Sequence, residues 1–198
     1  MIATPTLASI NHDLGAMVAG VLPSLVRVQA GAQALGAGTV WHPQGLIITN
    51  AHVVDGRPQP LVICADGSER PARLLAQDRE QDLAALAIDA HDLPTIELGD
   101  SRRLPVGTWV TALGHPWGIQ NAATGGIVIG AGAFLPEMEP GRREWLALAM
   151  KMRPGHSGGA LVDPAGRLVG INTMISGPAV SFAIPVHSVK RFLKARIV

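Results

Sequence analysis

The chain has 198 residues, a formal net charge of +1 and 47% hydrophobic residues, so it can fill a sizeable core and does not have the composition of a disordered chain. The near-neutral charge gives no reason to expect a nucleic-acid partner, and the absence of any apolar run of about 18 residues argues against a membrane span. The single cysteine, Cys64, excludes an internal disulfide and lies in an apolar run, so we expect it to be a buried strand residue.

The first half of the chain is predicted to be a short helix followed by β-strands. Residues 1–12 look irregular, and 13–22 have the spacing of a short amphipathic helix that ends before Pro23. Apolar runs bounded by turn residues predict strands at 25–29, 38–41, 46–49, 61–64, 72–76 and 83–88. The sequences HPQG at 42–45 and ADGS at 65–68 predict turns between them.

The second half repeats this pattern after a linker at 98–106. Strands are predicted at 109–113, 126–129, 145–150, 160–162, 168–173 and 181–185, and a helix with one basic face at 186–197. Strand and helix do not alternate, so a doubly wound sheet is not expected. The pattern favours an all-β fold of two six-stranded antiparallel barrels, at 1–100 and 101–198, with a short N-terminal helix and a C-terminal helix.

The first chemical signal is a serine in a glycine-rich turn. Ser157 lies in PGHSGGALV at 154–162, just before an apolar segment. Glycine accepts backbone angles that side chains forbid, so this turn can present the hydroxyl beside free backbone N–H groups. A hydrolase nucleophile needs that geometry, because the N–H groups stabilise the oxyanion that forms during attack. Taken alone, the stretch could equally be an ordinary loop.

Two further residues supply what a serine nucleophile requires. His52 follows the apolar run 46–49, and Asp82 opens the run 83–88. A histidine must take the hydroxyl proton, and a carboxylate must hold that histidine in the right tautomer. The chain order His, Asp, Ser is that of chymotrypsin-like double barrels. We therefore expect His52 as the base, Asp82 as the orienting acid and Ser157 as the nucleophile, with Asp78 as the alternative acid.

The surrounding motifs resemble those of the HtrA/DegP-type branch of trypsin-like serine proteases. TNAHVV at 49–54, QDLA at 81–84 and GHSGGAL at 155–161 are similar to its histidine, aspartate and serine motifs, and ALGHPWG, GINT and FAIP follow in order within 112–185. The resemblance implies a serine endopeptidase for unfolded or damaged proteins and peptides, with both barrels in one protease domain. We expect no metal or other cofactor, because no histidine pair has zinc-like spacing beside a cysteine or a carboxylate. It also implies an oxyanion hole made by the backbone of Gly155, His156 and Ser157.

The resemblance further implies which residues line the primary specificity pocket. They come from the segment before the nucleophile and from two neighbouring strands: Met150, Lys151, Met152, Arg153, Ile171, Asn172, Thr173 and Phe182. No Asp or Glu lies between Trp145 and Ser157, so a pocket for basic side chains is not expected. We predict an apolar pocket that takes small or medium apolar residues before the cut.

The chain departs from the family pattern in several ways. His156 and His115 stand where the family usually has asparagine. We interpret His156 as an ordinary surface residue, with tuning of the oxyanion turn as the alternative. Four further histidines are expected on the surface: His12, His42, His91 and His187.

Other departures concern assembly and compartment. Relatives usually continue into a PDZ domain, and none is expected within these 198 residues. The family commonly forms trimers through aromatic residues near the N-terminus. Residues 1–40 contain none, which argues against a trimer and leaves a homo-oligomer open. Residues 1–20 lack the features of a signal peptide, so we expect a cytoplasmic protein, or a periplasmic one if a targeting segment has been removed.

Two alternative functions stay open. The first is a protease-like chaperone or binding scaffold with a silent or regulated active site. The second is an α/β-hydrolase esterase, because GHSGG satisfies its G-x-S-x-G pattern and Asp163 and His187 follow in the right order. Little chain remains after Ser157 and strand–helix alternation is missing, which disfavours the esterase.

Overall fold

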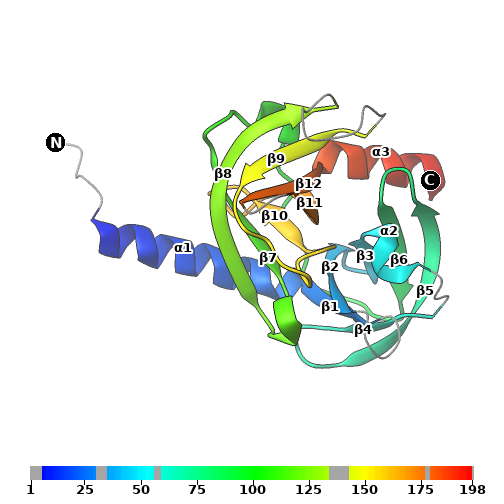
Figure 1. The fold of residues 1–198 in the computed structure, drawn as a ribbon. Helices are drawn as coiled ribbons and strands as arrows, with labels where there is room; N and C mark the ends of the chain where they lie inside the picture. The colour runs from blue at the N-terminus through cyan, green and yellow to red at the C-terminus, as the bar shows by residue number, and fades with distance from the viewer. Residues whose placement is uncertain (1–5, 30–34, 56–58, 134–142, 177–178, 198) are drawn as a thin grey trace.

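Short strands in the part of the chain that the structure describes close into two antiparallel barrels (Figure 1). The computed structural model describes residues 6–29, 35–55, 59–133, 143–176 and 179–197. The first barrel comprises β1 (Leu25–Gln29), β2 (Leu35–His42), β3 (Leu46–Thr49), β4 (Leu61–Ile63), β5 (Glu69–Asp78) and β6 (Leu83–Ile88). The second comprises β7 (Trp109–Gly114), β8 (Ala122–Gly132), β9 (Trp145–Ala149), β10 (Ala160–Val162), β11 (Leu168–Ser176) and β12 (Val180–Pro185).

The two barrels share one strand order, although the sequence shows no repeat. Neighbouring strands run β1-β2-β3-β6-β5-β4 around the first barrel and β7-β8-β9-β12-β11-β10 around the second. Every pairing between two of these strands is antiparallel. The predicted all-β fold of two six-stranded barrels is therefore confirmed, and the chymotrypsin-like architecture with it.

Strand β6 shows how the barrels are joined. All its residues are apolar, and all except Ala87 are buried. Ala84, Leu86 and Ile88 belong to the cluster inside the first barrel, whereas Leu83 and Ala85 belong to a second cluster that also contains residues of β9, β11 and β12. Alternate side chains thus face two different cores, which explains why the strand is apolar on both faces. Its first residue follows directly after Asp82.

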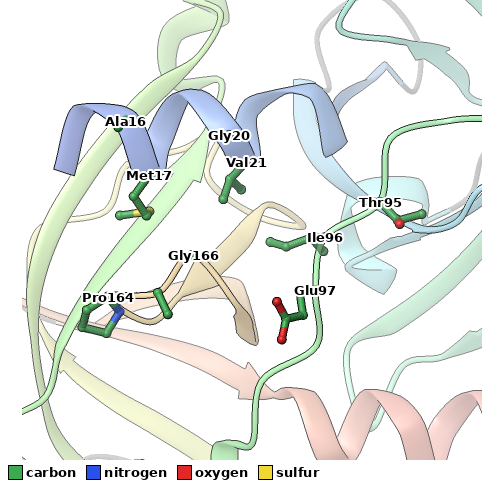
Figure 2. Close-up of a pocket in the computed structure, with 10 residues that line it drawn as sticks. Ala16, Met17, Gly20, Val21, Thr95, Ile96, Glu97, Pro164 and Gly166 are labelled. Carbon is green, nitrogen blue, oxygen red and sulfur yellow. The ribbon is translucent and has the colours of Figure 1, made fainter. Parts of the chain in front are cut away.

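The N-terminal helix, α1 (Leu7–Val21), is longer than the sequence indicates. It begins at Leu7 because the Thr6 side chain caps it, accepting the Ser9 N–H at 3.2 Å. The expectation that residues 7–12 are irregular was therefore wrong. The far end of α1 projects away from the barrels, where Leu7 is 86% exposed (Figure 1). The near end packs on the β10–β11 turn, with Met17 and Val21 facing Gly166 (Figure 2).

The remaining helices are short or lie across the barrels. They are α2 (Ala51–Val54), α3 (Val186–Arg196) and the 3₁₀ turns η1 (Leu22–Ser24), η2 (Ser101–Arg103) and η3 (Pro116–Gly118). Helix α3 buries Val189, Phe192 and Leu193 in the cluster between the barrels, so the predicted docked helix is confirmed.

No helix among the described residues is long and apolar enough to cross a membrane.

Candidate active site

His52 is placed by α2, a single helical turn that follows β3. Buried Asn50 precedes this turn and donates from Nδ2 to the carbonyl oxygen of Asp82 at 3.0 Å. The backbone N–H of His52 donates to Asp82 Oδ1 at 3.1 Å. These two bonds tie the helical turn to the start of β6. Because Ala51 and Val53 are buried while His52 is exposed, the imidazole lies at the surface with its orientation fixed by the backbone.

The Asp82 carboxylate is the hub of the site. His52 Nδ1 lies 3.0 Å from Oδ1 and 2.9 Å from Oδ2, and Thr173 donates from Oγ1 to Oδ2 at 2.6 Å. Burial works to raise the pKa of Asp82, but the hydrogen bonds from His52 and Thr173 outweigh it and leave that pKa below its ordinary value. An ionised carboxylate can accept a proton from Nδ1, and Nε2 of His52 is then the nitrogen that can take up a further proton.

The alternative acid, Asp78, is used elsewhere. Its Oδ1 accepts the N–H of Gln81 at 2.9 Å, and its other oxygen lies 3.5 Å from Arg196. Of the two aspartates, only Asp82 contacts His52.

The backbone on both sides of Ser157 explains why the serine motif has glycine at 155 and 158. The N–H of His156 donates to the carbonyl of Arg153 at 3.0 Å, and Gly155 has a φ of +101° at the third position, as in a type II turn. A Cβ on Gly155 would lie 2.5 Å from the carbonyl oxygen of His115. Gly158 has a φ of +84°, and a Cβ there would lie 2.0 Å from the carbonyl oxygen of Ala37. Both positions therefore require glycine for conformation and for space.

Both barrels anchor the serine. Ala37 of β2 donates its N–H to the Ser157 carbonyl at 2.8 Å, and Gly158 donates to the Asn172 carbonyl of β11 at 2.9 Å. Within the described residues, neither the N–H of Gly155 nor that of Ser157 has a protein acceptor. Two backbone donors beside the hydroxyl are thus free for a ligand oxygen.

Ser157 and His52 line the same pocket, of about 260 Å³, together with Met152, Arg153, Pro154, His156 and Thr173. The Ser157 hydroxyl donates to the carbonyl of Thr173 at 2.9 Å. In this state the hydroxyl is therefore engaged by β11 rather than by His52. Thr173 meets both ends of the site, with its hydroxyl on Asp82 and its carbonyl on Ser157.

The predicted specificity residues separate into three groups. Met152, Arg153 and Thr173 line the pocket, and Lys151 is exposed outside it. The others are buried in the second barrel and its interface: Met150, Ile171, Asn172 and Phe182. Asn172 donates from Nδ2 to the carbonyls of Leu113 and Ala160, both at 3.0 Å, and these bonds fix β11 behind the serine.

Two histidines are not where the sequence placed them. The interpretation of His156 as a surface residue was wrong, because it is only 4% exposed beneath the serine turn. His187 is not a surface residue either. Its Nδ1 lies 2.8 Å from Ser101 Oγ and its Nε2 lies 2.9 Å from Glu144 Oε2, with a side-chain exposure of 15%. The partners of His187 lie 86 and 43 positions away, and the ring of His156 turns back to the backbone of Arg153. Neither contact follows from the local sequence pattern.

Sequence reasoning missed three supporting contacts of the site. These are the Asn50 amide on Asp82, the Thr173 hydroxyl on Asp82 and the Ala37 N–H on Ser157. Thr173 was selected only as a pocket residue. A buried polar residue in an apolar strand, such as Asn172 or Thr173 in GINT, is the signal that could have pointed to such contacts.

Two six-stranded barrels with His, Asp and Ser at their junction define the chymotrypsin-type double-barrel class. The sequence pattern of the trypsin-like peptidase domain matches residues 36–171, and the chain belongs to that family. A probable periplasmic serine endoprotease of DegP-like type from Pseudomonas savastanoi pv. phaseolicola is 43% identical over 163 residues, which are 80% of this chain and 34% of the relative. A DegP-like relative from Halomonas elongata is 40% identical over 78% of this chain and 33% of its own length.

Solved structures agree with this assignment. The HtrA-type protease AlgW with a tripeptide matches with a TM-score of 0.84 and 32% identity, over 91% of this chain and 62% of that one. A serine endoprotease from Yersinia pestis matches with a TM-score of 0.83 and 32% identity, over 98% of this chain and 68% of that one. The chain spans about a third of the length of the curated relatives it matches.

Proposed function

We propose that the protein is a serine endopeptidase in which Ser157 is the nucleophile and His52 the general base. Asp82 orients the base and stabilises its protonated form. The observation that carries the proposal is the double contact of His52 Nδ1 with the Asp82 carboxylate, at 3.0 and 2.9 Å, in a pocket shared with Ser157. The relatives are described as serine endoproteases, which supports the same activity.

The reaction begins with a rotation of the Ser157 hydroxyl. Its proton leaves the Thr173 carbonyl and turns to Nε2 of His52, which accepts it as Oγ attacks the peptide carbonyl carbon. The tetrahedral intermediate collapses to an acyl-enzyme when His52 returns the proton to the leaving amine. Water then attacks the ester by the same route, releasing the acid product and the free hydroxyl. Asp82 stays ionised throughout and stabilises the imidazolium.

The free N–H groups of Gly155 and Ser157 are proposed to hold the oxyanion. They donate to no protein acceptor among the described residues, so they cost no rearrangement when the intermediate forms. The loss of one such donor typically costs about 100- to 1,000-fold in rate. His156 does not share in this role, because its N–H is already bound to Arg153 at 3.0 Å.

The substrates we propose are unfolded proteins and peptides with a small or medium apolar residue before the cut. Met152 gives the pocket an apolar wall, and Arg153 places a cation at it, which disfavours a basic side chain. The AlgW structures contain peptides, which supports a peptide as the substrate class.

The proposal is tested by incubating the protein and its Ser157→Ala variant with reduced, denatured casein, with a fluorophosphonate probe added to parallel samples. We expect cleavage and labelling by the natural sequence alone, and cut sites that follow small or medium apolar residues. Circular dichroism of the variant controls for folding. Labelling without cleavage of any casein or peptide would favour an esterase.

The competing function is a chaperone or scaffold. It predicts that Ser157→Ala still suppresses aggregation of a denatured protein while the natural sequence cleaves nothing. That pair of results would overturn the endopeptidase assignment.

A further inference from the structure

His156 is a buried histidine to which the reaction gives no chemical step. Its Nδ1 lies 3.2 Å from the backbone nitrogen of Arg153 and 3.1 Å from the Arg153 carbonyl oxygen. Its own N–H donates to the same carbonyl at 3.0 Å. His156 thus contacts both the N–H and the carbonyl of Arg153. Arg153 is the first residue of the turn that carries the Gly155 N–H.

We propose that His156 is a positioning residue for the oxyanion turn: its neutral imidazole holds Arg153 in place, and protonation of the ring releases the turn and stops catalysis. The inference rests on the proposed endopeptidase function, because it assigns Gly155 to the oxyanion hole.

The neutral ring fits the turn in one tautomer. Among the described residues, Nδ1 is the acceptor that the Arg153 N–H reaches, whereas the Arg153 carbonyl already receives the His156 N–H. The proposal therefore places the proton of the neutral ring on Nε2, with Nδ1 accepting from the Arg153 N–H. Protonation places a second proton on Nδ1, which can then no longer accept from Arg153. The Arg153 N–H then loses its partner, while the new Nδ1–H competes with the His156 N–H for the Arg153 carbonyl at 3.1 Å.

The surroundings offer a charged ring one acceptor, the Arg153 carbonyl oxygen 3.1 Å from Nδ1, and no carboxylate among the groups that act on it. Two basic groups act on or beside the ring: the Arg153 guanidinium on the same turn, and His115 after β7. None of the groups that act on His156 or His115 is a carboxylate. The Nε2 atoms of both rings are buried and have no partner in the described part of the protein. Burial lowers the pKa of His156. The contact of the ring with the Arg153 backbone raises that pKa and the Arg153 guanidinium lowers it, and the pKa stays below its ordinary value.

The other parts of the turn are held by further contacts. The bond from the Arg153 N–H to His156 Nδ1 is therefore the one whose loss would let the turn move. The N–H of His115 holds the Gly155 carbonyl at 2.9 Å, and the Arg153 guanidinium lies 4.6 Å from the centre of the Trp117 ring. A Cβ on Gly114 would lie 2.6 Å from Cα of His156, so the chain has no room to move toward β7. The Arg153 backbone has no other polar partner among the described residues than His156.

The test compares His156→Asn and His156→Leu with the natural sequence. Asparagine carries an acceptor oxygen two bonds beyond Cβ, as Nδ1 is, and does not titrate. Leucine fills a similar space without an acceptor. The exposed His91→Asn is the matched control. The measurement is kcat and KM on a peptide taken from a casein cut site, from about pH 5 to 8.

We expect His156→Asn to keep kcat within about threefold at pH 8, and His156→Leu to lose about 10- to 1,000-fold in kcat with little change in KM, as for a lost oxyanion donor. At the acid end, log kcat/KM of the natural sequence should fall more steeply than that of His156→Asn, because protonation of His156 adds a loss that asparagine does not suffer. Circular dichroism at each pH excludes global unfolding.

Equal kcat for His156→Leu and the natural sequence, or equal acid slopes for His156→Asn and the natural sequence, would overturn the inference. An independent readout comes from ring nitrogen NMR shifts in the Ser157→Ala background. We expect the His156 signal, assigned by its loss in His156→Asn, to report the Nε2–H tautomer at neutral pH. An Nδ1–H tautomer would also overturn it. If the natural sequence cleaves nothing, the proposed function fails, and the NMR result still decides how His156 binds Arg153.

Discussion

The protein brings a serine, a histidine and a carboxylate together at two places, and we propose chemistry at only one of them. At the junction of the barrels, His52 binds Asp82 and shares a pocket with Ser157. Near α3, His187 lies 2.8 Å from Ser101 and 2.9 Å from Glu144. The second arrangement has the tighter serine–histidine contact, yet Ser101 is only 4% exposed.

The difference lies in access and in backbone donors. Ser157 sits on a glycine turn that faces a pocket, and two N–H groups there have no acceptor in the described part of the protein. Ser101 opens η2 and accepts the N–H of His187 at 3.3 Å, while Arg191 and Ser188 also bind Glu144. This second network fastens α3 to the second barrel. The three groups alone do not make a hydrolase, because the nucleophile also needs room for a carbonyl and donors for its oxyanion.

The largest expected difference between the two sites comes from removing each serine. Ser157→Ala should lower kcat/KM on a casein-derived peptide by about 10⁴- to 10⁶-fold, because no other nucleophile reaches the acyl carbon. Ser101→Ala should leave kcat/KM within about twofold and affect only stability. A matching loss in Ser101→Ala, with its circular dichroism spectrum intact, would break the distinction.

The second-largest difference is expected between substitutions of the two carboxylates, Asp82 and Glu144. Asp82→Asn keeps the shape but removes the charge that holds His52 in its base tautomer, so kcat should fall about 10⁴-fold. Glu144→Gln should retain kcat and lower the unfolding free energy by about 1 kcal/mol, because its ion pairs are partly exposed. Steady-state kinetics and urea unfolding measure the two effects. Equal losses of kcat would contradict the assignment.

The buried histidine beside the active turn should make stability depend on pH. Burial lowers the pKa of His115 to about 4, from an unfolded value of 6.5, and Arg27 and His156 add to this. A base with a depressed folded pKa adds stability above pH 6.5 that is lost as the pH falls toward 4. The full effect is about 3 kcal/mol.

Urea unfolding of the natural sequence and of His115→Asn at pH 8 and at about pH 4.5 checks this effect. We expect the natural sequence to lose more stability on acidification than the variant does, each compared with its own value at pH 8. The exposed His91→Asn is the control and should follow the natural sequence. Identical acid losses in all three proteins would show that His115 does not contribute.

The smallest difference in kcat is expected from removing the hydroxyls that donate to the two carboxylates, Thr173 on Asp82 and Ser188 on Glu144. Thr173→Val removes the bond to Asp82 at 2.6 Å while keeping shape and backbone, and a hydrogen bond to a charged group is worth about 1.5–3 kcal/mol. We expect kcat to fall about 10- to 100-fold. Ser188→Ala removes the bond to Glu144 at 3.2 Å and should leave kcat unchanged. A Thr173→Val enzyme with normal kcat would show that this contact has no catalytic weight.

Much of the architecture could be predicted from local patterns. Strand β6 is an apolar run of the right length, and Gly45 and Gly67 mark turns with positive φ, so the strand count follows from periodicity and turn residues. The start of α1 was missed because a Thr6 cap is a weak signal at a polar N-terminus. The shared strand order of the barrels also stayed hidden, because a barrel constrains apolar spacing and not residue identity.

The sequence by itself determined the double barrel, the family and the candidates His52, Asp82 and Ser157, because these depend on periodicity and on motifs of adjacent residues. Only the tertiary structure decided which other residues meet them. It brought Thr173 to Asp82 across 91 positions of the chain and buried His156 against Arg153. It also paired Ser101 with His187, 86 positions apart. Contacts between distant segments depend on how the barrels pack against each other, which no local pattern encodes.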